Sequence, residues 1–362
     1  AAILKPEGGK LWHFDTSLES TDGIKPLEGA VATLRPNEGR FGGAVAVEEE
    51  TTNLIPSNRL KFEGWLAYQG ASVTVEQGHS IPGITPDGAT RIQISGGTHI
   101  VKYYTDVGPG DAGTPASYRV WVRNIGDKPV EVHGNAIHVS NIVYPGETKL
   151  CTGSTDAVSG TAIRQIQFPA LDVDDSLDFI AYQPQIEEKP FATSFVDGTR
   201  AAGRLEYPRN LLDKDEGSLF LWVFATEREV PQNSYIPIVS TLATSSPQFM
   251  IMRFRSSDSS QKLHVWEYEL SSRHDFPLGE WKHVGVSWSK SKGSIALYID
   301  GELQDSASFS GDFTLATTDV IRIGRWGSHT LNGLIDELLI LPYAATEEEI
   351  KGWYEAKKPF ID

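Results

Sequence analysis

Short runs of alternating or continuously apolar residues extend along almost the whole of this 362-residue chain. Clusters of Gly, Pro, Ser and Asp separate these runs, as expected for strands joined by turns. Asp300-Gly301 is a strong tight-turn signal between two of them, because glycine tolerates positive φ. In the C-terminal half the expected strands are 218–226, 249–254, 262–270, 282–288, 294–300, 320–326 and 334–341. The pattern predicts an all-β fold.

A second β-rich block runs from about Asn53 to Ile186. Its expected strands are 72–77, 90–95, 99–107, 117–124, 129–135, 162–168 and 176–186. The block is long enough to form its own sandwich. One helix is expected near the end of the chain, where Thr346 and Glu349 have capping-box spacing. We expect that helix to cover a sandwich and to carry no chemistry.

Charge and composition narrow the choice of partners. The chain has 32 basic and 48 acidic residues, a formal charge of −16, which argues against a nucleic-acid partner. Cys151 is the only cysteine, so neither an intrachain disulfide nor a thiolate metal site is expected. No run has membrane-spanning length, and no signal peptide is visible, although a removed leader would leave no trace.

The segments 279–303 and 321–350 closely resemble the laminin-G-like, concanavalin-A-like jelly-roll family. They contain, in the family's order, its W-x-H-V strand, Y-I-D-G hairpin, I-G strand and G-x-I-D-E strand before a short helix. The family's first strands resemble 11–23 and 39–47, far upstream, whereas 204–208 resembles the strand that should follow them directly.

The resemblance therefore implies a jelly roll formed by residues 1–50 and 195–362 and interrupted by a second sandwich at 51–194. The alternative is a plain tandem in which residues 1–50 only decorate the second module. The start of the insert, from Thr51, resembles family 4/9-like carbohydrate-binding modules, which implies a galactose-binding-like jelly roll. Residues 183–203 resemble the end of such modules in structural proteins of tailed phages.

No catalytic pattern is visible. Retaining glycosidases need two carboxylates about 5 Å apart, and no strand shows the spaced acidic pattern that would present them. Asp336 and Glu337 are expected on opposite faces of one strand. We predict a protein that is not an enzyme. A glycoside hydrolase or lyase stays open, because sandwich active sites are built from strands distant in sequence.

Ligand binding is predicted for the insert. Alternation along 117–124 places Tyr118, Val120 and Val122 on one face and Arg119, Trp121 and Arg123 on the other. Across an expected hairpin, Val130 and Val132 point inward and His133 outward. Trp121, Arg119, Arg123 and His133 are thus expected to share one exposed face that binds glycan, by aromatic stacking and hydrogen bonding.

The alternative for Trp121 is packing under a loop or against the jelly roll, with the arginines paired to acids. Trp65, Tyr68 and Tyr104 are further candidates at the rim of the site. Trp222, Trp266 and Trp288 lie in the expected jelly-roll strands and are predicted to be core.

The resemblance also implies a structural Ca²⁺ held by Asp336 on the last strand, with Asp15 as a second oxygen ligand. In the insert, Tyr182 and Gln183 stand where related modules commonly carry an Asp pair, which argues against a metal there.

Together these observations predict a non-catalytic protein that binds a host glycan or polysaccharide as a tail or surface component of a phage virion. Its partners would then include other virion subunits, and a homo-oligomer is possible. One alternative is a purely structural decoration or tail subunit. A second is an extracellular polysaccharide-degrading enzyme or its accessory module.

Overall fold

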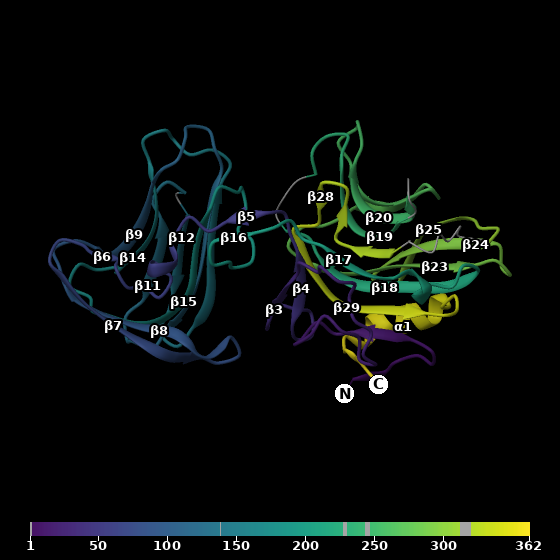
Figure 1. Cartoon of the computed structure of the whole chain (residues 1–362), viewed down its shortest axis with the longest axis horizontal. Helices are drawn as coiled ribbons and strands as arrows, with labels where there is room; N and C mark the ends of the chain where they lie inside the picture. Colours follow the sequence, from purple (N-terminus) through teal and green to yellow (C-terminus); the bar gives the residue numbers. More distant parts are fainter. Residues whose placement is uncertain (1, 138, 227–229, 243–246, 312–319) are drawn as a thin grey trace. The chain divides into compact units, whose positions relative to one another are not determined.

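The computed structural model describes residues 2–137, 139–226, 230–242, 247–311 and 320–362. Contacts divide the chain into two compact units. Unit 1 comprises residues 1–49 together with 201–362, and unit 2 comprises residues 50–200 (Figure 1). The sequence predicts these divisions after residues 50 and 194. Both units are built from antiparallel sheets packed as sandwiches, which confirms the predicted all-β class.

The larger sheet of unit 1 has eight strands in the order β25-β24-β23-β18-β29-β4-β3, with β2 also paired to β29. Their bounds are β2 Lys10–Trp12, β3 Thr33–Arg35, β4 Ala44–Val47, β18 Glu216–Phe224, β23 Trp281–Ser289, β24 Ser294–Ile299, β25 Glu302–Ser308 and β29 Gly333–Leu341.

The smaller sheet of unit 1 has six strands in the order β17-β26-β19-β20-β21-β22. Their bounds are β17 Leu205–Pro208, β19 Tyr235–Leu242, β20 Pro247–Arg255, β21 Gln261–Trp266, β22 Leu270–Asp275 and β26 Val320–Ile323. Two short ribbons pair β1 Ile3–Leu4 with β30 Phe360–Ile361, and β27 Arg325–Trp326 with β28 His329–Thr330. One 3₁₀ turn, η2, spans Arg209–Leu211.

The N-terminal segment is an integral part of unit 1. All four residues of β4 are buried, and β4 pairs with β29 from the far end of the chain. Trp12, Val45 and Val47 contribute to the same core as Leu219 and Val286. Burial of these side chains stabilises the fold by about 1.5–3 kcal/mol each. Residues 1–49 are thus structural members of the sandwich rather than a decoration of it.

Helix α1, Glu347–Ala356, packs on the outer face of the larger sheet of unit 1 (Figure 1). Its buried Ile350 joins a cluster with Phe220 and Leu339. The predicted capping box is present, since Thr346 and Glu349 satisfy each other's backbone N–H groups. Among the described residues, no helix has the length and apolar character needed to cross a bilayer.

Unit 2 has two five-stranded sheets, which we name sheet A and sheet B. Sheet A has the order β13-β10-β15-β8-β7 and sheet B the order β12-β11-β14-β9-β6. In sheet A the bounds are β7 Ala71–Ile81, β8 Thr85–Gly96, β10 Ala116–Asn124, β13 Thr148–Thr155 and β15 Leu177–Glu187. In sheet B they are β6 Leu66–Ala67, β9 Val101–Pro109, β11 Val130–Gly134, β12 Val139–Val143 and β14 Ile163–Pro169.

The two sheets of unit 2 enclose one apolar core. Tyr118, Val120 and Val122 from sheet A and Val130 and Val132 from sheet B are all fully buried in it, as their alternation predicts. Burial places each strand's alternate residues on the outer faces of the sandwich. The 3₁₀ turn η1, Ser57–Arg59, lies in the loop that precedes β6.

The two connections of unit 2 leave it side by side. Strands β5, Thr51–Thr52, and β16, Thr199–Arg200, form an antiparallel ribbon at its ends. Within unit 1, the backbone N–H of Gly203 donates to the carbonyl of Glu48 at 2.6 Å, so the chain ends there are also adjacent. A side chain at position 203 would meet the Glu48 backbone at 2.7 Å, which glycine avoids. An insertion between adjacent surface points disturbs a host sandwich little.

Candidate functional site

One row of side chains crosses the outer face of sheet B, and we call it the open row. Cα pairing aligns Leu66, Tyr104, Gln167, His133 and Ser140, one residue from each of the five strands. Leu66 and Ser140 are exposed, and the three between them are half-buried. Adjacent residues in such a row lie about 5 Å apart and project to the same side. The row therefore presents an aromatic ring, an amide and an imidazole on one surface.

Neighbouring contacts hold the members of the open row in place. The ring of Tyr68 lies edge-on to Tyr104, with centroids 6.0 Å apart, and edge-on to His99 on its other side at 5.1 Å. Edge-to-face aromatic pairs are favourable and fix the ring planes. The Gln167 amide donates to Gln165, one position along the same face of β14. The polar and aromatic groups are thus oriented before any ligand arrives.

His133 Nδ1 lies 2.7 Å from Ser140 Oγ across the β11–β12 pair. Among the described residues, His133 forms no other side-chain hydrogen bond, and its second ring nitrogen can bind a ligand. Amide and imidazole groups offer both donors and acceptors in fixed planes. Such an arrangement suits a ligand with several hydroxyl groups and an apolar ring face.

Sequence reasoning proposed Tyr68, Tyr104 and His133 separately, and the structure brings them together on sheet B. It missed Gln165 and Gln167. The segment "RQIQF" could have predicted them, because its two glutamines alternate with Ile166 and Phe168, which are buried. Alternation of amides opposite core residues marks a polar sheet face.

The predicted common face of Trp121, Arg119, Arg123 and His133 is wrong. β10 carries the first three and belongs to sheet A, whereas β11 carries His133 and belongs to sheet B. The outer faces of two packed sheets point in opposite directions. The expected β10–β11 hairpin is instead a connection that crosses from one sheet to the other, so these residues cannot contact one ligand together.

Arg119 is not on an exposed face, since only 2% of its surface is accessible. Its guanidinium donates to the carbonyl of Thr193 at 3.1 Å. Gln185 and Glu187, both fully buried, also bond to Thr193. Arg119 therefore belongs to a buried polar network at the end of unit 2. The hydrogen bonds of this network offset the free-energy cost of burying polar groups away from water.

Trp121 and Arg123 are half-buried on the outer face of sheet A. Trp121 is paired in register with Tyr182 and packs in a small cluster with Ile81, Ala89 and Ile180. Arg123 donates to the Thr148 hydroxyl at 3.3 Å. Trp121 is thus supported by packing from its own unit, on the sheet opposite to the open row.

Trp65 is a core residue rather than a residue of the rim. It is 6% exposed, stacks on Phe168 with ring centroids 5.4 Å apart, and donates its indole N–H to the Arg59 carbonyl at 2.9 Å. Trp266 in unit 1 was predicted to be a core residue, but it is 43% exposed at the end of β21. Trp222 and Trp288 are buried, as predicted.

The two proposed calcium ligands bind backbone amides. The Phe41 N–H donates to Asp336 Oδ2 at 3.0 Å, and the Gly43 N–H donates to Asp15 Oδ1 at 2.6 Å. Together the carboxylates fasten the loop before β4. Among the described residues, no group of three or more His, Cys, Asp or Glu side chains is placed to hold a metal. Oxygens that face N–H donors do not fit a calcium cage as they stand, so calcium remains a prediction from the resemblance.

Asp336 and Glu337 are both buried, each 2% exposed. The pairing of β18 with β29 shifts register between Phe220 and Trp222, which inserts an extra residue of β29 at Glu337. Burial, helped by the negative charges of Glu337 and Asp15, raises the pKa of Asp336 to about 7, although the hydrogen bond from the Phe41 N–H opposes this rise. Glu337 also pairs with His13 at 3.6 Å.

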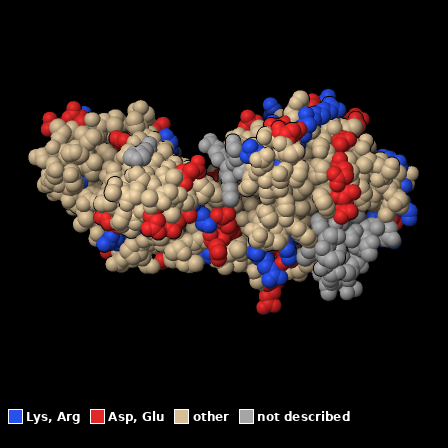
Figure 2. All heavy atoms as spheres, turned by 90° about the horizontal axis from the view of Figure 1, so that it is seen from above, with Lys and Arg blue, Asp and Glu red and all other residues tan. Residues whose placement is uncertain are grey.

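Charged side chains of both signs lie on the face of each unit seen in Figure 2.

Comparison with protein-family models supports the fold of unit 1. Residues 197–351 match the laminin G 3 model, described as the concanavalin A-like lectin/glucanases superfamily. The structure adds strands β2, β3 and β4 from residues 1–49 to the same sandwich. Comparison of the sequence with curated proteins gives no match.

Solved structures show weak similarity. A heptameric SAP-like pentraxin from Limulus polyphemus is 16% identical over 38% of this chain and 68% of its own, with a TM-score of 0.30. Domain 4 of the arabinanase AbnA from Geobacillus stearothermophilus, in complex with arabinotriose, is 24% identical over 42% of this chain and 73% of its own, with a TM-score of 0.34. The binding domain of botulinum neurotoxin serotype D is 16% identical over 42% of this chain and 40% of its own, with a TM-score of 0.29.

Residues 197–351, which lie almost entirely in unit 1, are thus similar to the concanavalin A-like lectin/glucanases superfamily, and unit 1 has the corresponding jelly-roll fold.

Proposed function

We propose that the protein binds glycan chains without cleaving them, and that the open row on sheet B is a contact surface for the sugar. The observation that carries the proposal is the alignment of Tyr104, Gln167 and His133 across three adjacent strands. A sugar ring has an apolar face that stacks on aromatic rings, and its hydroxyls pair with planar amides and imidazoles. An open face also accepts a chain that continues in both directions.

The absence of cleavage is part of this proposal. It is supported by the burial of Asp336 and Glu337, the adjacent acids of the jelly roll, which lie out of reach of a polysaccharide. Each of their carboxylates accepts a backbone N–H, from Phe41 and Phe360 respectively, and so has a structural task.

The test is incubation of the full chain with a panel of cell-wall and capsular polysaccharides, followed by measurement of both bound and released sugar. Tyr104→Ala is expected to weaken binding about tenfold, since loss of one aromatic contact is worth about 1.4 kcal/mol. Tyr144→Ala is the matched control, because Tyr144 is an exposed tyrosine of unit 2 outside the open row.

Equal binding by the Tyr104 and Tyr144 variants would exclude the open row as the contact surface. If instead Trp121→Ala abolished binding while Tyr104→Ala did not, sheet A would be the glycan face. Release of oligosaccharides would contradict the proposal that the protein is not an enzyme.

A location in a phage particle is a finer part of the proposal. It is supported by the sequence resemblance of residues 183–203 to structural proteins of tailed phages. Detection of the chain by mass spectrometry in purified particles from its source would test it, and light scattering of the purified chain would test for a homo-oligomer. Recovery of the chain only from the culture medium would favour the extracellular alternative.

A further inference from the structure

A pocket of about 480 Å³ lies in unit 2 where strand β8 separates from β15. The two strands are paired only as far as Thr90 and Ala181, whereas β15 continues along β10. The loop that contains η1 and the segment at Phe195 close the resulting gap. Its volume falls within the range of about 300–1,000 Å³ that is usual for small-ligand sites. The pocket lies outside the open row, which belongs to sheet B.

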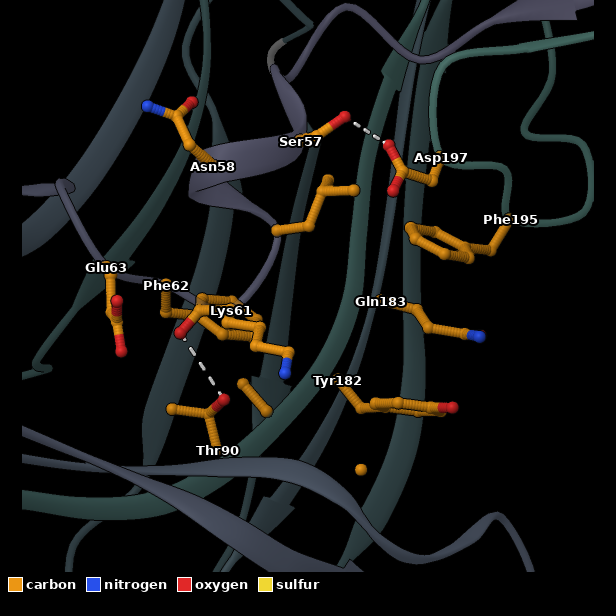
Figure 3. A pocket seen from close by; sticks show the side chains of 13 residues that line it. Ser57, Asn58, Lys61, Phe62, Glu63, Thr90, Tyr182, Gln183, Phe195 and Asp197 are labelled. Atoms are coloured by element: carbon orange, nitrogen blue, oxygen red, sulfur yellow. Dashed lines mark hydrogen bonds between the residues drawn. The ribbon is translucent and has the colours of Figure 1, made fainter.

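Figure 3 shows how the groups around this pocket are arranged. Phe195, Gln183 and Tyr182 lie one below another on one wall, and Lys61 extends from the opposite wall toward them. The wall and the side chain opposite it thus combine the rings of Phe195 and Tyr182, a planar amide and an ammonium group. Asn58 lies at its margin.

Gln183 has an unusual backbone conformation. Gln183 has a φ of +55°, in the left-handed region that glycine prefers, and it lies where the β10–β15 register shifts. Such a conformation costs about 1–3 kcal/mol and persists where the surroundings enforce it. Bulges of this kind redirect side chains and occur frequently beside binding sites.

Hydrogen bonds fix the opposite wall. The carbonyl of Lys61 accepts from the Gln77 amide at 2.9 Å and from the Thr90 hydroxyl at 3.4 Å. The Ser57 hydroxyl donates to the Asp197 carboxylate, which joins the two walls (Figure 3). The pocket is therefore preformed, and little conformational entropy would be lost in ordering it when a ligand binds.

The pocket lining carries two carboxylates, those of Glu63 and Asp197, and one ammonium group, that of Lys61, which extends toward the wall formed by Tyr182, Gln183 and Phe195 (Figure 3). Asp197 is engaged by Ser57, and Glu63 accepts from Gln77 at 3.4 Å. Within the described part of the chain, the Lys61 ammonium forms no ion pair. An ammonium beside aromatic rings and an amide is suited to a sugar ring that carries a carboxylate.

We propose that this pocket binds a single acidic sugar residue of the uronic acid class. The sugar ring lies against Tyr182 and Phe195, its carboxylate pairs with Lys61, and Gln183 bonds a hydroxyl. The site differs from the open row in both ligand and location, so either one can fail without the other.

The test is calorimetric titration of the full chain with methyl β-glucuronide and, as the uncharged match, methyl β-glucoside. We expect the glucuronide to bind about tenfold more tightly, the effect of roughly 1.4 kcal/mol from one charge-assisted contact. Lys61→Gln should remove that preference, and Phe195→Ala should weaken both sugars. The matched control is Lys149→Gln, since Lys149 is an exposed lysine on β13 outside the pocket. Melting temperatures of all variants verify that they are folded.

Two further measurements sharpen the result. The glucuronide preference should shrink as salt rises from about 0.05 to 0.5 M, because the ion pair is partly exposed. Equal affinity for both sugars, or a preference that survives Lys61→Gln, would overturn the proposed role of Lys61. Acetate that competes as well as glucuronide would reduce the site to a simple anion site and overturn the sugar assignment. No saturable binding of either sugar would overturn the pocket itself, while leaving the Tyr104 test unaffected.

Discussion

The two units differ in what covers the outer faces of their sheets. Unit 1 buries Asp336, Glu337 and His283, and it covers the outer face of its larger sheet with α1. Unit 2 leaves its open row on sheet B uncovered and has the pocket beside β15. Both units bury polar groups that join segments distant in sequence, such as Asp336 with Phe41 in unit 1 and Arg119 with Thr193 in unit 2, but unit 2 also presents a row of polar and aromatic side chains on an outer sheet face. This difference is the reason why we place both proposed ligand sites in unit 2.

The largest difference between the two units is expected when each is produced as a separate fragment. Residues 50–200 form one continuous unit with its own core and are expected to fold alone. Residues 201–362 alone lack β2, β3 and β4 and are expected to remain unfolded, because Trp12, Val45 and Val47 are missing from the core. Circular dichroism and thermal melting of the two fragments would measure this.

The control is a chain in which a short flexible linker joins residue 49 to residue 201. It should recover a cooperative melt, since Glu48 and Gly203 are hydrogen-bonded neighbours. A well-folded 201–362 fragment would show that residues 1–49 are dispensable after all.

Two tryptophans, buried Trp65 in unit 2 and exposed Trp266 in unit 1, are expected to differ in their contribution to stability. Trp65→Ala in unit 2 should lower the free energy of unfolding of that unit by about 3–5 kcal/mol, the usual loss for a large aromatic in a core. Trp266→Ala in unit 1 should change stability by less than about 0.5 kcal/mol, as for other exposed positions. Denaturant titration of both variants measures the difference. Comparable effects would contradict the placement of Trp266 at the surface.

The buried acid of unit 1 predicts a dependence on pH. The pKa of Asp336 in the folded state is about 7, above its unfolded value of 3.8, so folding favours the protonated form. The cost of ionising it grows as pH rises from about 4 to 7, and then reaches as much as about 4 kcal/mol. Asp336→Asn keeps an oxygen for the Phe41 N–H and is expected to be more stable than the wild type at pH 8, but not at pH 4.

This measurement is made in a chelator, and then repeated with calcium. A wild type that gains stability only with calcium, and a variant that does not, would support the metal site implied by the resemblance. A melting temperature unchanged by calcium would exclude it. Asp336→Asn that is less stable at every pH would contradict the raised pKa. Glu337→Gln is a necessary control, because Glu337 and its partner His13 also have shifted pKa values.

The sequence by itself determined the class of fold and the inner faces of the strands. Alternation assigned Tyr118, Val120 and Val122 to the core, and burial confirms all three. The motifs around β23, β24 and β29 predicted the concanavalin A-like fold, which the family match of residues 197–351 supports, and the capping box placed α1. These features depend on neighbours within a few residues, so local patterns suffice to predict them.

Only the tertiary structure decided which outward-facing residues meet. Alternation shows that Trp121 and His133 both point away from the core, yet their strands lie in different sheets. Tyr104 and Gln167 are separated by more than sixty residues in the chain and become neighbours through the pairing of β9 with β14. Strand partners are chosen by the packing of the whole sandwich, because each backbone edge can pair with any other of suitable shape. A binding face made of several strands is therefore set by long-range contacts that no local pattern contains.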